Sequence, residues 1–390
     1  MTENNLLQDG IHALLPREKM APSARKLRDT YARVPGAPLF RREFGFYSLE
    51  AWAQQGMPEC NSWEDFAALF DYDPPGHLAL GQLGWTEPAL EPAFEVKVIE
   101  DRGDYEVEQD FAGRRVLFFK GRRNGFMPEY LECAVKDRRT WEENVKWRLD
   151  PATPARYQDL PERMARARAA AGQGMIIQQT ISGGGMYLRS MIGTEKMMYA
   201  FYDMPDVIHD MMQTWLALAD AVIARHQEHV TIDELFISED ICYKSGPLIA
   251  PDMIRKFFFP YYQQLITNIK RRQLDPARHL YIQIDTDGFA NPVIPLYREI
   301  GMDIMSPFEV ASGCDVVEIG RQYPDLAIFG GIDKRVLAEG RKAIDQMVER
   351  ILPVMRARGG YIPTCDHGVP AEVPYQDYLY YRRRCIELGG

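Results

Sequence analysis

Residues 280–288 have the sequence Leu-Tyr-Ile-Gln-Ile-Asp-Thr-Asp-Gly, a short apolar run that ends in two carboxylates and a turn glycine. The run is too short for a typical helix, and its length and isoleucines favour a buried strand. The Asp287-Gly288 step that follows favours a turn. The same order of a short apolar run, turn residues and a longer helical pattern recurs after residue 170. This stretch therefore decides the fold class.

Five other segments share the pattern, and helical patterns separate them. The predicted strands are Met175–Gln179, Glu234–Ser238, Asp303–Ser306, Leu326–Phe329 and Gly360–Pro363. The helical patterns lie at about 194–230, 251–273, 292–300, 314–322, 340–358 and 376–387. This alternation predicts parallel strands joined by crossover helices. Two more strands, near Leu39–Phe46 and Leu78–Leu83, would complete a (β/α)8 barrel.

An open dinucleotide-binding sheet is disfavoured, because no G-x-G-x-x-G turn follows the first clear strand. Gly183-Gly184-Gly185 alone is weak evidence for a phosphate site. We expect one barrel domain over 1–390, with an N-terminal helical extension at 1–75 and a core at 170–390. Residues 94–120 contain three alternating runs separated by turn residues, which predicts an inserted antiparallel β-meander.

The composition narrows the class of protein. The chain has 390 residues, 46% of them hydrophobic, and a net charge of −10, which disfavours nucleic acid and anionic membranes as partners. The first residues lack the pattern of a secretory signal, and no apolar run is long enough for a membrane helix. The six cysteines are widely spaced, which favours reduced thiols. We expect a cytoplasmic protein.

Candidate residues lie at or just after the end of each of the six strands after residue 170, where the chemistry of barrel enzymes lies. They are Gln178, Gln179 and Ser182; Glu239 and Asp240; Asp285 and Asp287; Pro307 and Glu309; Asp333; and Cys365, Asp366 and His367. Any one of these carboxylates alone could be solvated or cap a helix. Several anions gathered in one mouth would need a metal, a cationic substrate or raised pKa values.

Asp285 and Asp287, with His367 or Cys365, could form a metal site. The alternative is a purely structural role, with a turn at Asp287-Gly288 and a helix cap at Asp285. His367 could be a general acid or base whose tautomer a neighbouring acid holds. Cys365 could be a thiolate ligand or an inert buried thiol, and Tyr187 could reach into the mouth.

Five blocks together resemble the uroporphyrinogen decarboxylase superfamily, which includes corrinoid-dependent methyltransferases. The blocks are Glu239-Asp-Ile-Cys-Tyr-Lys-Ser-Gly-Pro-Leu-Ile-Ala-Pro251, Asp285-Thr-Asp-Gly288, Ser306-Pro-Phe-Glu309, Gly330-Gly-Ile-Asp-Lys334 and Gly359-Gly-Tyr-Ile-Pro-Thr-Cys-Asp-His-Gly-Val-Pro370. The resemblance covers residues 170–390 well and implies a (β/α)8 barrel. In relatives that act on a thiol, zinc is held by a His-x-Cys pair and a final Cys. This sequence has Asp285, Asp287 and His367 at those positions, so no thiolate remains and zinc is doubtful.

The resemblance and the acidic strand ends favour a methyltransferase. It would move a methyl group from a small O- or N-methylated substrate to the cobalt of a corrinoid on a partner protein. The expected catalytic residues are His367, Asp287 and Glu239. The expected substrate-binding residues are Asp240, Glu309, Tyr187, Gln178 and Asp333.

Two alternatives stay open. One is a decarboxylase of uroporphyrinogen or a related acid, with Arg189, Arg255 and Arg335 as the cations that would converge on its substrate. The other is a non-catalytic corrinoid- or tetrapyrrole-binding protein. The protein could also form a homodimer.

Overall fold

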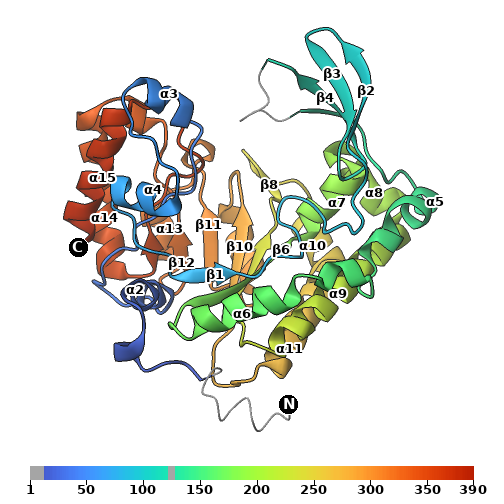
Figure 1. Cartoon of the computed structure of the whole chain (residues 1–390), viewed down its shortest axis with the longest axis horizontal. Helices are drawn as coiled ribbons and strands as arrows, with labels where there is room; N and C mark the ends of the chain where they lie inside the picture. The colour runs from blue at the N-terminus through green and yellow to red at the C-terminus, as the bar shows by residue number, and fades with distance from the viewer. Residues whose placement is uncertain (1–12, 122–127) are drawn as a thin grey trace.

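A seven-stranded parallel sheet, curled into a barrel with helices outside it, forms the centre of the molecule (Figure 1). The computed structural model describes residues 13–121 and 128–390, so the first twelve residues of the expected extension lie outside it. The strand order is β1-β6-β7-β10-β11-β12-β13. The bounds are β1 His77–Ala79, β6 Ile176–Ser182, β7 Glu234–Ser238, β10 Tyr281–Thr286, β11 Ile304–Pro307, β12 Ala327–Phe329 and β13 Tyr361–Ile362.

The predicted barrel is confirmed. Strand β7 has the predicted bounds, and every other predicted strand except Leu39–Phe46 starts within one residue of an observed one. Asp285 of β10 pairs with Ser238 of β7 on one side and with Ser306 of β11 on the other. Because the strands are parallel and in this register, the residues that follow them meet at one rim.

The prediction of a strand at Leu39–Phe46 is wrong. This segment makes only one isolated bridge, from Phe46 to Val369, and no named strand. Its backbone amides bond elsewhere: Arg41 N–H donates to Asp73 Oδ2 at 2.7 Å, and Leu39 N–H donates to the Gly389 carbonyl at 3.0 Å. The segment is therefore irregular chain, bonded to Asp73, Val369 and Gly389.

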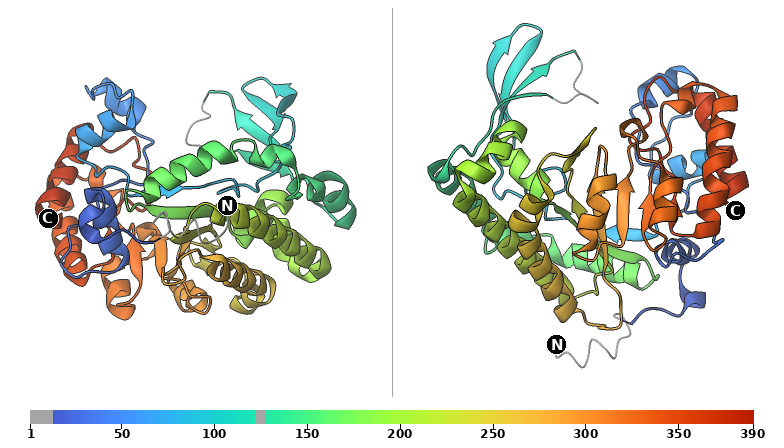
Figure 2. Two further views of the ribbon diagram at one scale, coloured as in Figure 1. Left: turned by 60° about the horizontal axis from the view of Figure 1, so that its bottom comes forward. Right: turned by 180° about the vertical axis from the view of Figure 1, so that it is seen from behind.

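Crossover helices cover the outside of the barrel (Figure 2). They are α6 Leu160–Ala171, α7 Gly184–Ile192, α8 Thr194–Asp203, α9 Pro205–Gln227, α10 Pro251–Phe257, α11 Phe259–Arg272, α12 Ile294–Arg298, α13 Val316–Gln322, α14 Arg341–Arg358 and α15 Tyr375–Gly389. Two predicted helices are each divided, at Met204-Pro205 and at Phe258, next to prolines that lack the amide a continuous helix needs. The N-terminal segment adds α2 Pro22–Tyr31, α3 Leu49–Gln54 and α4 Trp63–Phe70, and α5 is Arg138–Thr140.

The predicted meander is an antiparallel sheet that stands out from the barrel as an arm (Figures 1 and 2). Its strands are β2 Lys97–Arg102, β3 Tyr105–Gln109, β4 Arg115–Phe119 and β5 Glu129–Glu132, paired in that order. The fourth strand, β5, lies beyond the predicted range. A two-stranded hairpin, β8 Cys242–Tyr243 with β9 Gly246–Pro247, follows β7.

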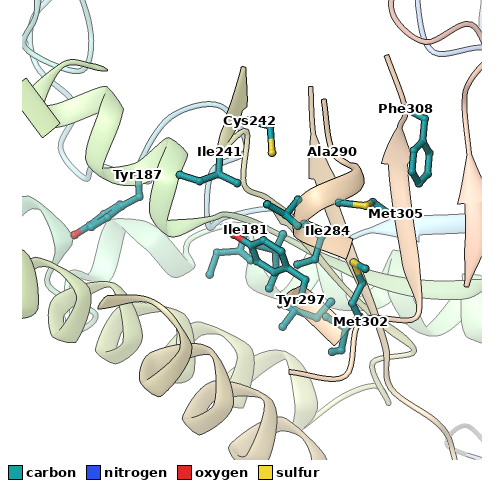
Figure 3. Packing of buried hydrophobic residues seen from close by; sticks show 14 of the residues in the cluster. Ile181, Tyr187, Ile241, Cys242, Ile284, Ala290, Tyr297, Met302, Met305 and Phe308 are labelled. Atoms are coloured by element: carbon teal, nitrogen blue, oxygen red, sulfur yellow. The ribbon is translucent and has the colours of Figure 1, made fainter. Parts of the chain in front are cut away.

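Apolar side chains on the outer face of the sheet pack against the helices, as Figure 3 shows for Ile181, Ile284 and Met305. A second cluster includes Ile304 and Ala327, which begin their strands, together with Tyr31 and Phe40 from the N-terminal segment. The end of the barrel where the strands begin is therefore filled with side chains. The opposite end is where the polar residues gather.

Among the helices of residues 13–121 and 128–390, none has the length and apolar character required to span a bilayer.

Candidate active site at the barrel mouth

Asp287 is the central acid of the mouth. It follows β10, and the αL conformation of Gly288 (φ 79°) turns the chain directly after it. Burial, together with the charges of Asp240, Asp285 and Glu309, raises the pKa of Asp287 to about 8 against the opposing charge of Lys334. Within the described part of the chain no hydrogen bond to its carboxylate is found, and 40% of its side chain is exposed. Asp287 can therefore hold a proton at neutral pH and remains open to a ligand.

His367 faces Asp287 across the mouth. Its Nε2 lies 3.9 Å from Asp287 Oδ2. The backbone N–H of Gly368 donates to its Nδ1 at 2.9 Å, so the proton of the neutral ring is on Nε2 and faces Asp287. Burial and the charge of Lys334 lower the pKa of His367. A neutral imidazole beside a protonated carboxyl is the state that this geometry favours near neutral pH.

Two aromatic side chains from the N-terminal segment enclose His367. The rings of Phe44 and Tyr47 lie 5.1 and 5.7 Å from the imidazole, centroid to centroid, and the Tyr47 hydroxyl is 3.3 Å from Nδ1. Phe44 is 39% exposed and Tyr47 is 53% exposed. Neither residue could be identified from the sequence, because only the fold places them next to a loop more than 300 positions later.

Asp285 lies deeper in the barrel than Asp287. Burial raises its pKa to about 6, although the Ser306 hydroxyl donates to its Oδ2. Gln283 in turn donates to the Ser306 hydroxyl at 2.8 Å. The backbone carbonyl of Asp285 accepts from the amides of Glu239 and Asp240, at 2.8 and 3.0 Å. These bonds fix the end of β7 against β10.

Asp240 and Glu309 flank the central pair and are already bonded. Asp240, which has a positive φ of 40°, forms an ion pair with Arg189. Glu309 Oε2 accepts from the Gly288 amide at 3.1 Å and from the Ser312 hydroxyl at 2.9 Å. Both carboxylates shape the loops of the mouth and supply negative charge close to Asp287.

The neighbouring acid expected to hold the His367 tautomer does not do so. Asp366 is fully buried, and its carboxylate accepts from Lys334 Nζ and from the Val310 amide, each at 2.9 Å. The Gly368 amide fixes the tautomer instead. The amide donor could not be inferred from side-chain chemistry.

Glu239, expected to be catalytic, lies behind the mouth and is fully buried. Its Oε1 accepts from the Gly185 amide at 2.9 Å, and its Oε2 accepts from the Tyr262 hydroxyl. Burial raises its pKa to about 7. A Cβ at Gly185 would lie 2.7 Å from the Glu239 carbonyl oxygen, so the glycine run serves close packing and its amides are occupied.

Tyr187, expected to line the mouth, lies in the core instead. It points away from the sheet, and its hydroxyl donates to the Met211 carbonyl of α9 at 3.1 Å (Figure 3). Asp333, another expected ligand of the substrate, pairs with Arg335 at 2.8 Å. Gln178 lies on β6 opposite Glu234, inside the barrel.

The four residues expected to bind a metal do not form one cluster. Over the described ranges, no group of three His, Cys, Asp or Glu side chains is close enough to hold a metal ion. Cys365 is fully buried, and burial raises the pKa of its thiol well above the ordinary value, which favours the inert alternative. The residues present do not fit the zinc site of the thiol-activating relatives.

The three arginines that would favour a carboxylate substrate are all neutralised. Arg189 pairs with Asp240, Arg335 pairs with Asp333, and Arg255 pairs with Asp252 and Glu299 on the surface. Arg42 differs from them, because no ion pair with a carboxylate is found for it in the described residues. Its guanidinium lies 5.4 Å from the centre of the Phe329 ring, and its charge lowers the pKa values of Glu234 and Asp285.

Comparisons with known proteins place this site in a family. The model of the uroporphyrinogen decarboxylase (URO-D) family matches residues 139–381, more than half of the chain. A curated uroporphyrinogen decarboxylase of Geobacter metallireducens is 27% identical over 136 residues, 35% of this chain and 37% of that protein. One of Crocosphaera subtropica is 29% identical over 178 residues, 44% of this chain and 45% of its own length. The aligned regions thus span less than half of these relatives.

Among solved structures, a methyltransferase from Methanosarcina mazei superimposes with a TM-score of 0.57 at 13% identity, over 94% of this chain and 98% of that one. At this identity the match shows a shared fold. The family match, which covers all five blocks in full and most of the chain, identifies the superfamily predicted from the sequence. The chain belongs to the uroporphyrinogen decarboxylase family.

Proposed function

We propose that the chain is a methyltransferase that takes a methyl group from a small O- or N-methylated compound and passes it to a corrinoid carried by a partner protein. The observation that carries the proposal is Asp287, an open carboxyl whose pKa is raised to about 8. A carboxyl with this pKa is a general acid at neutral pH, which is what a departing oxygen requires.

The corrinoid would supply the nucleophile that accepts the methyl group. The protein's own residues then have two tasks, to hold the substrate and to provide a proton. Asp287 donates its proton to the oxygen or nitrogen that loses the methyl group, and the resulting carboxylate regains a proton from solvent. His367, neutral with Nε2–H toward Asp287, stabilises that carboxylate with a hydrogen bond. The protonated state of Asp287 particularly suits a methyl ether, because an alkoxide or phenoxide is a poor leaving group.

The remaining mouth residues orient the substrate. Phe44 and Tyr47 offer exposed aromatic surface beside His367, which suits an aryl or other apolar group next to the reacting atom. Asp240 and Glu309 keep the mouth negative, so a neutral or cationic donor is favoured over a polycarboxylate.

The test combines the purified protein, a reduced corrinoid protein and a panel of methyl ethers and methylamines. We expect the cobalt absorption spectrum to change from the reduced to the methylated form with at least one donor. Asp287→Asn should bind the donor and lose the spectral change. Absence of a change with every donor, together with carbon dioxide release from a porphyrinogen or a smaller acid, would overturn the proposal.

One observation favours decarboxylation as a second candidate function. Arg42 brings a cation without a carboxylate partner in the described chain close to Asp285, and such a group could anchor an acid substrate. In that case Arg42→Leu would abolish carbon dioxide release. Binding of a corrinoid or tetrapyrrole without any turnover would favour the non-catalytic alternative.

A further inference from the structure

The segment that contains Phe44 and Tyr47 is joined directly to the loop that contains His367. Tyr47 N–H donates to the Val369 carbonyl at 2.9 Å, and Val369 N–H donates to the Gly45 carbonyl at 2.8 Å. Phe46 and Val369 form the isolated parallel bridge. Two segments from opposite ends of the chain thus build one wall of the mouth.

One side chain, Glu43, ties this wall together from beneath. Its Oε1 accepts from the amide of Cys365 at 2.6 Å and from the amide of Phe44 at 3.0 Å. Its Oε2 accepts from the Tyr378 hydroxyl at 3.0 Å, and that hydroxyl lies 2.5 Å from the Tyr72 hydroxyl. The carboxylate therefore connects the aromatic segment, the His367 loop and helix α15.

The other side of the His367 loop is held by Asp366, through Lys334 and the Val310 amide. Glu43 thus holds the loop at Cys365, and the bonds of the Asp366 side chain hold it at the next residue. Burial raises the pKa of Glu43, while the bonds to Phe44, Cys365 and Tyr378 and the nearby charge of Arg382 act against that rise. The donors all point at the two carboxylate oxygens, as an acceptor in this place requires.

We propose that Glu43 is a positioning residue that holds the His367 ring, through the Cys365 amide and the Phe44–Tyr47 segment, in the orientation that faces Asp287. Glu43 touches no reacting atom in this role. The inference about geometry stands on the contacts above, and its catalytic consequence rests on the proposed function.

The experiment uses the full chain labelled with ¹⁵N-histidine, with the His367 signals assigned from a His367→Gln spectrum. In wild type we expect Nδ1 to be unprotonated and Nε2 to be protonated. Glu43→Ala should average the two nitrogen shifts and lower kcat about 10- to 100-fold with a smaller change in KM. Glu43→Gln retains an oxygen for the Cys365 and Phe44 amides, so it should restore both signals and turnover to within about 3-fold.

The matched control is Asp345→Asn. Like Glu43, Asp345 is a carboxylate that accepts hydrogen bonds from helix α15, here from Tyr380 and Arg384, but it lies on α14, and no hydrogen bond from it to the mouth is found among the described residues. It should leave the His367 signals unchanged. Unchanged signals in folded Glu43→Ala, or in the near-isosteric Glu43→Met where the alanine variant does not fold, would overturn the proposal. Fast hydrogen exchange of the Cys365 amide in wild type would overturn it too, and needs no variant. Altered signals in a protein without methyl transfer would leave the positioning role intact and reject the proposed function.

Discussion

Glu239 and Asp287 lie on neighbouring strand ends and both have a raised pKa, yet their surroundings differ. The Glu239 carboxylate is fully enclosed, and the Gly185 amide and the Tyr262 hydroxyl occupy its two oxygens. Asp287 is part-exposed, and the neutral imidazole of His367 lies 3.9 Å from its carboxylate. A raised pKa alone does not separate a structural acid from a catalytic one. Exposure to solvent and carboxylate oxygens without a hydrogen-bond partner distinguish the catalytic acid from the structural one.

The largest expected effect is that of Asp287→Asn. The amide preserves the shape of the side chain but cannot donate an acidic proton, so turnover of an ether donor should fall about 10²- to 10⁴-fold. Steady-state kinetics of methyl transfer measures it, and calorimetry with the donor should give an affinity close to wild type. Turnover within a few-fold of wild type would remove Asp287 from the mechanism.

Glu239→Ala should act on stability instead. It leaves the buried Gly185 amide and Tyr262 hydroxyl without their acceptor and opens a cavity, at a cost of about 2–4 kcal/mol in the free energy of unfolding. Urea unfolding measures this loss, and the specific activity of the folded fraction should stay within about 3-fold of wild type. A variant of normal stability and abolished turnover would reverse the roles assigned to the two acids.

The raised pKa of Asp287 predicts that both turnover and stability depend on pH. Turnover should fall tenfold per unit as pH rises above about 8, where Asp287 loses its proton. Because the folded state holds this proton to a higher pH than the unfolded chain, the contribution of Asp287 to the free energy of unfolding falls as pH rises from about 4 to 8.

Asp287→Asn has no carboxyl to titrate at this position, so it lacks the fall in stability that Asp287 causes as pH rises. The stability of this variant relative to wild type should therefore increase by about 1–2 kcal/mol between pH 5 and pH 8, after allowance for the solvent around a part-exposed group. Urea unfolding at the two pH values measures the difference. A variant whose relative stability is the same at both would show that the carboxyl titrates normally.

The smallest effect is expected for Asp333→Asn. Asp333 pairs with Arg335, whose side chain is 58% exposed, and such pairs contribute little. Thermal unfolding should show a loss below about 1 kcal/mol, and the KM for the methyl donor should not change. A large rise in KM would return Asp333 to the substrate-binding residues.

Local sequence predicted the barrel because each buried strand is a short apolar run between turn residues, and Glu234–Ser238 was found with its true ends. The convergence of Asp285, Asp287, Glu309 and His367 follows from parallel strands whose ends share one rim. The sequence could not show that Tyr187 lies on the face of α7 toward α9. It also missed Glu43, Phe44 and Tyr47, whose partners lie more than 300 residues away and are set by tertiary structure alone.

The hydrogen bond between Glu43 and the Cys365 amide joins positions 322 residues apart. During synthesis the first of these residues leaves the ribosome long before the second, so it must wait for nearly the whole polypeptide. Helices and neighbouring strands form from nearer contacts and need no such delay. The wall that carries His367 therefore cannot be completed before residue 365 has been added to the chain.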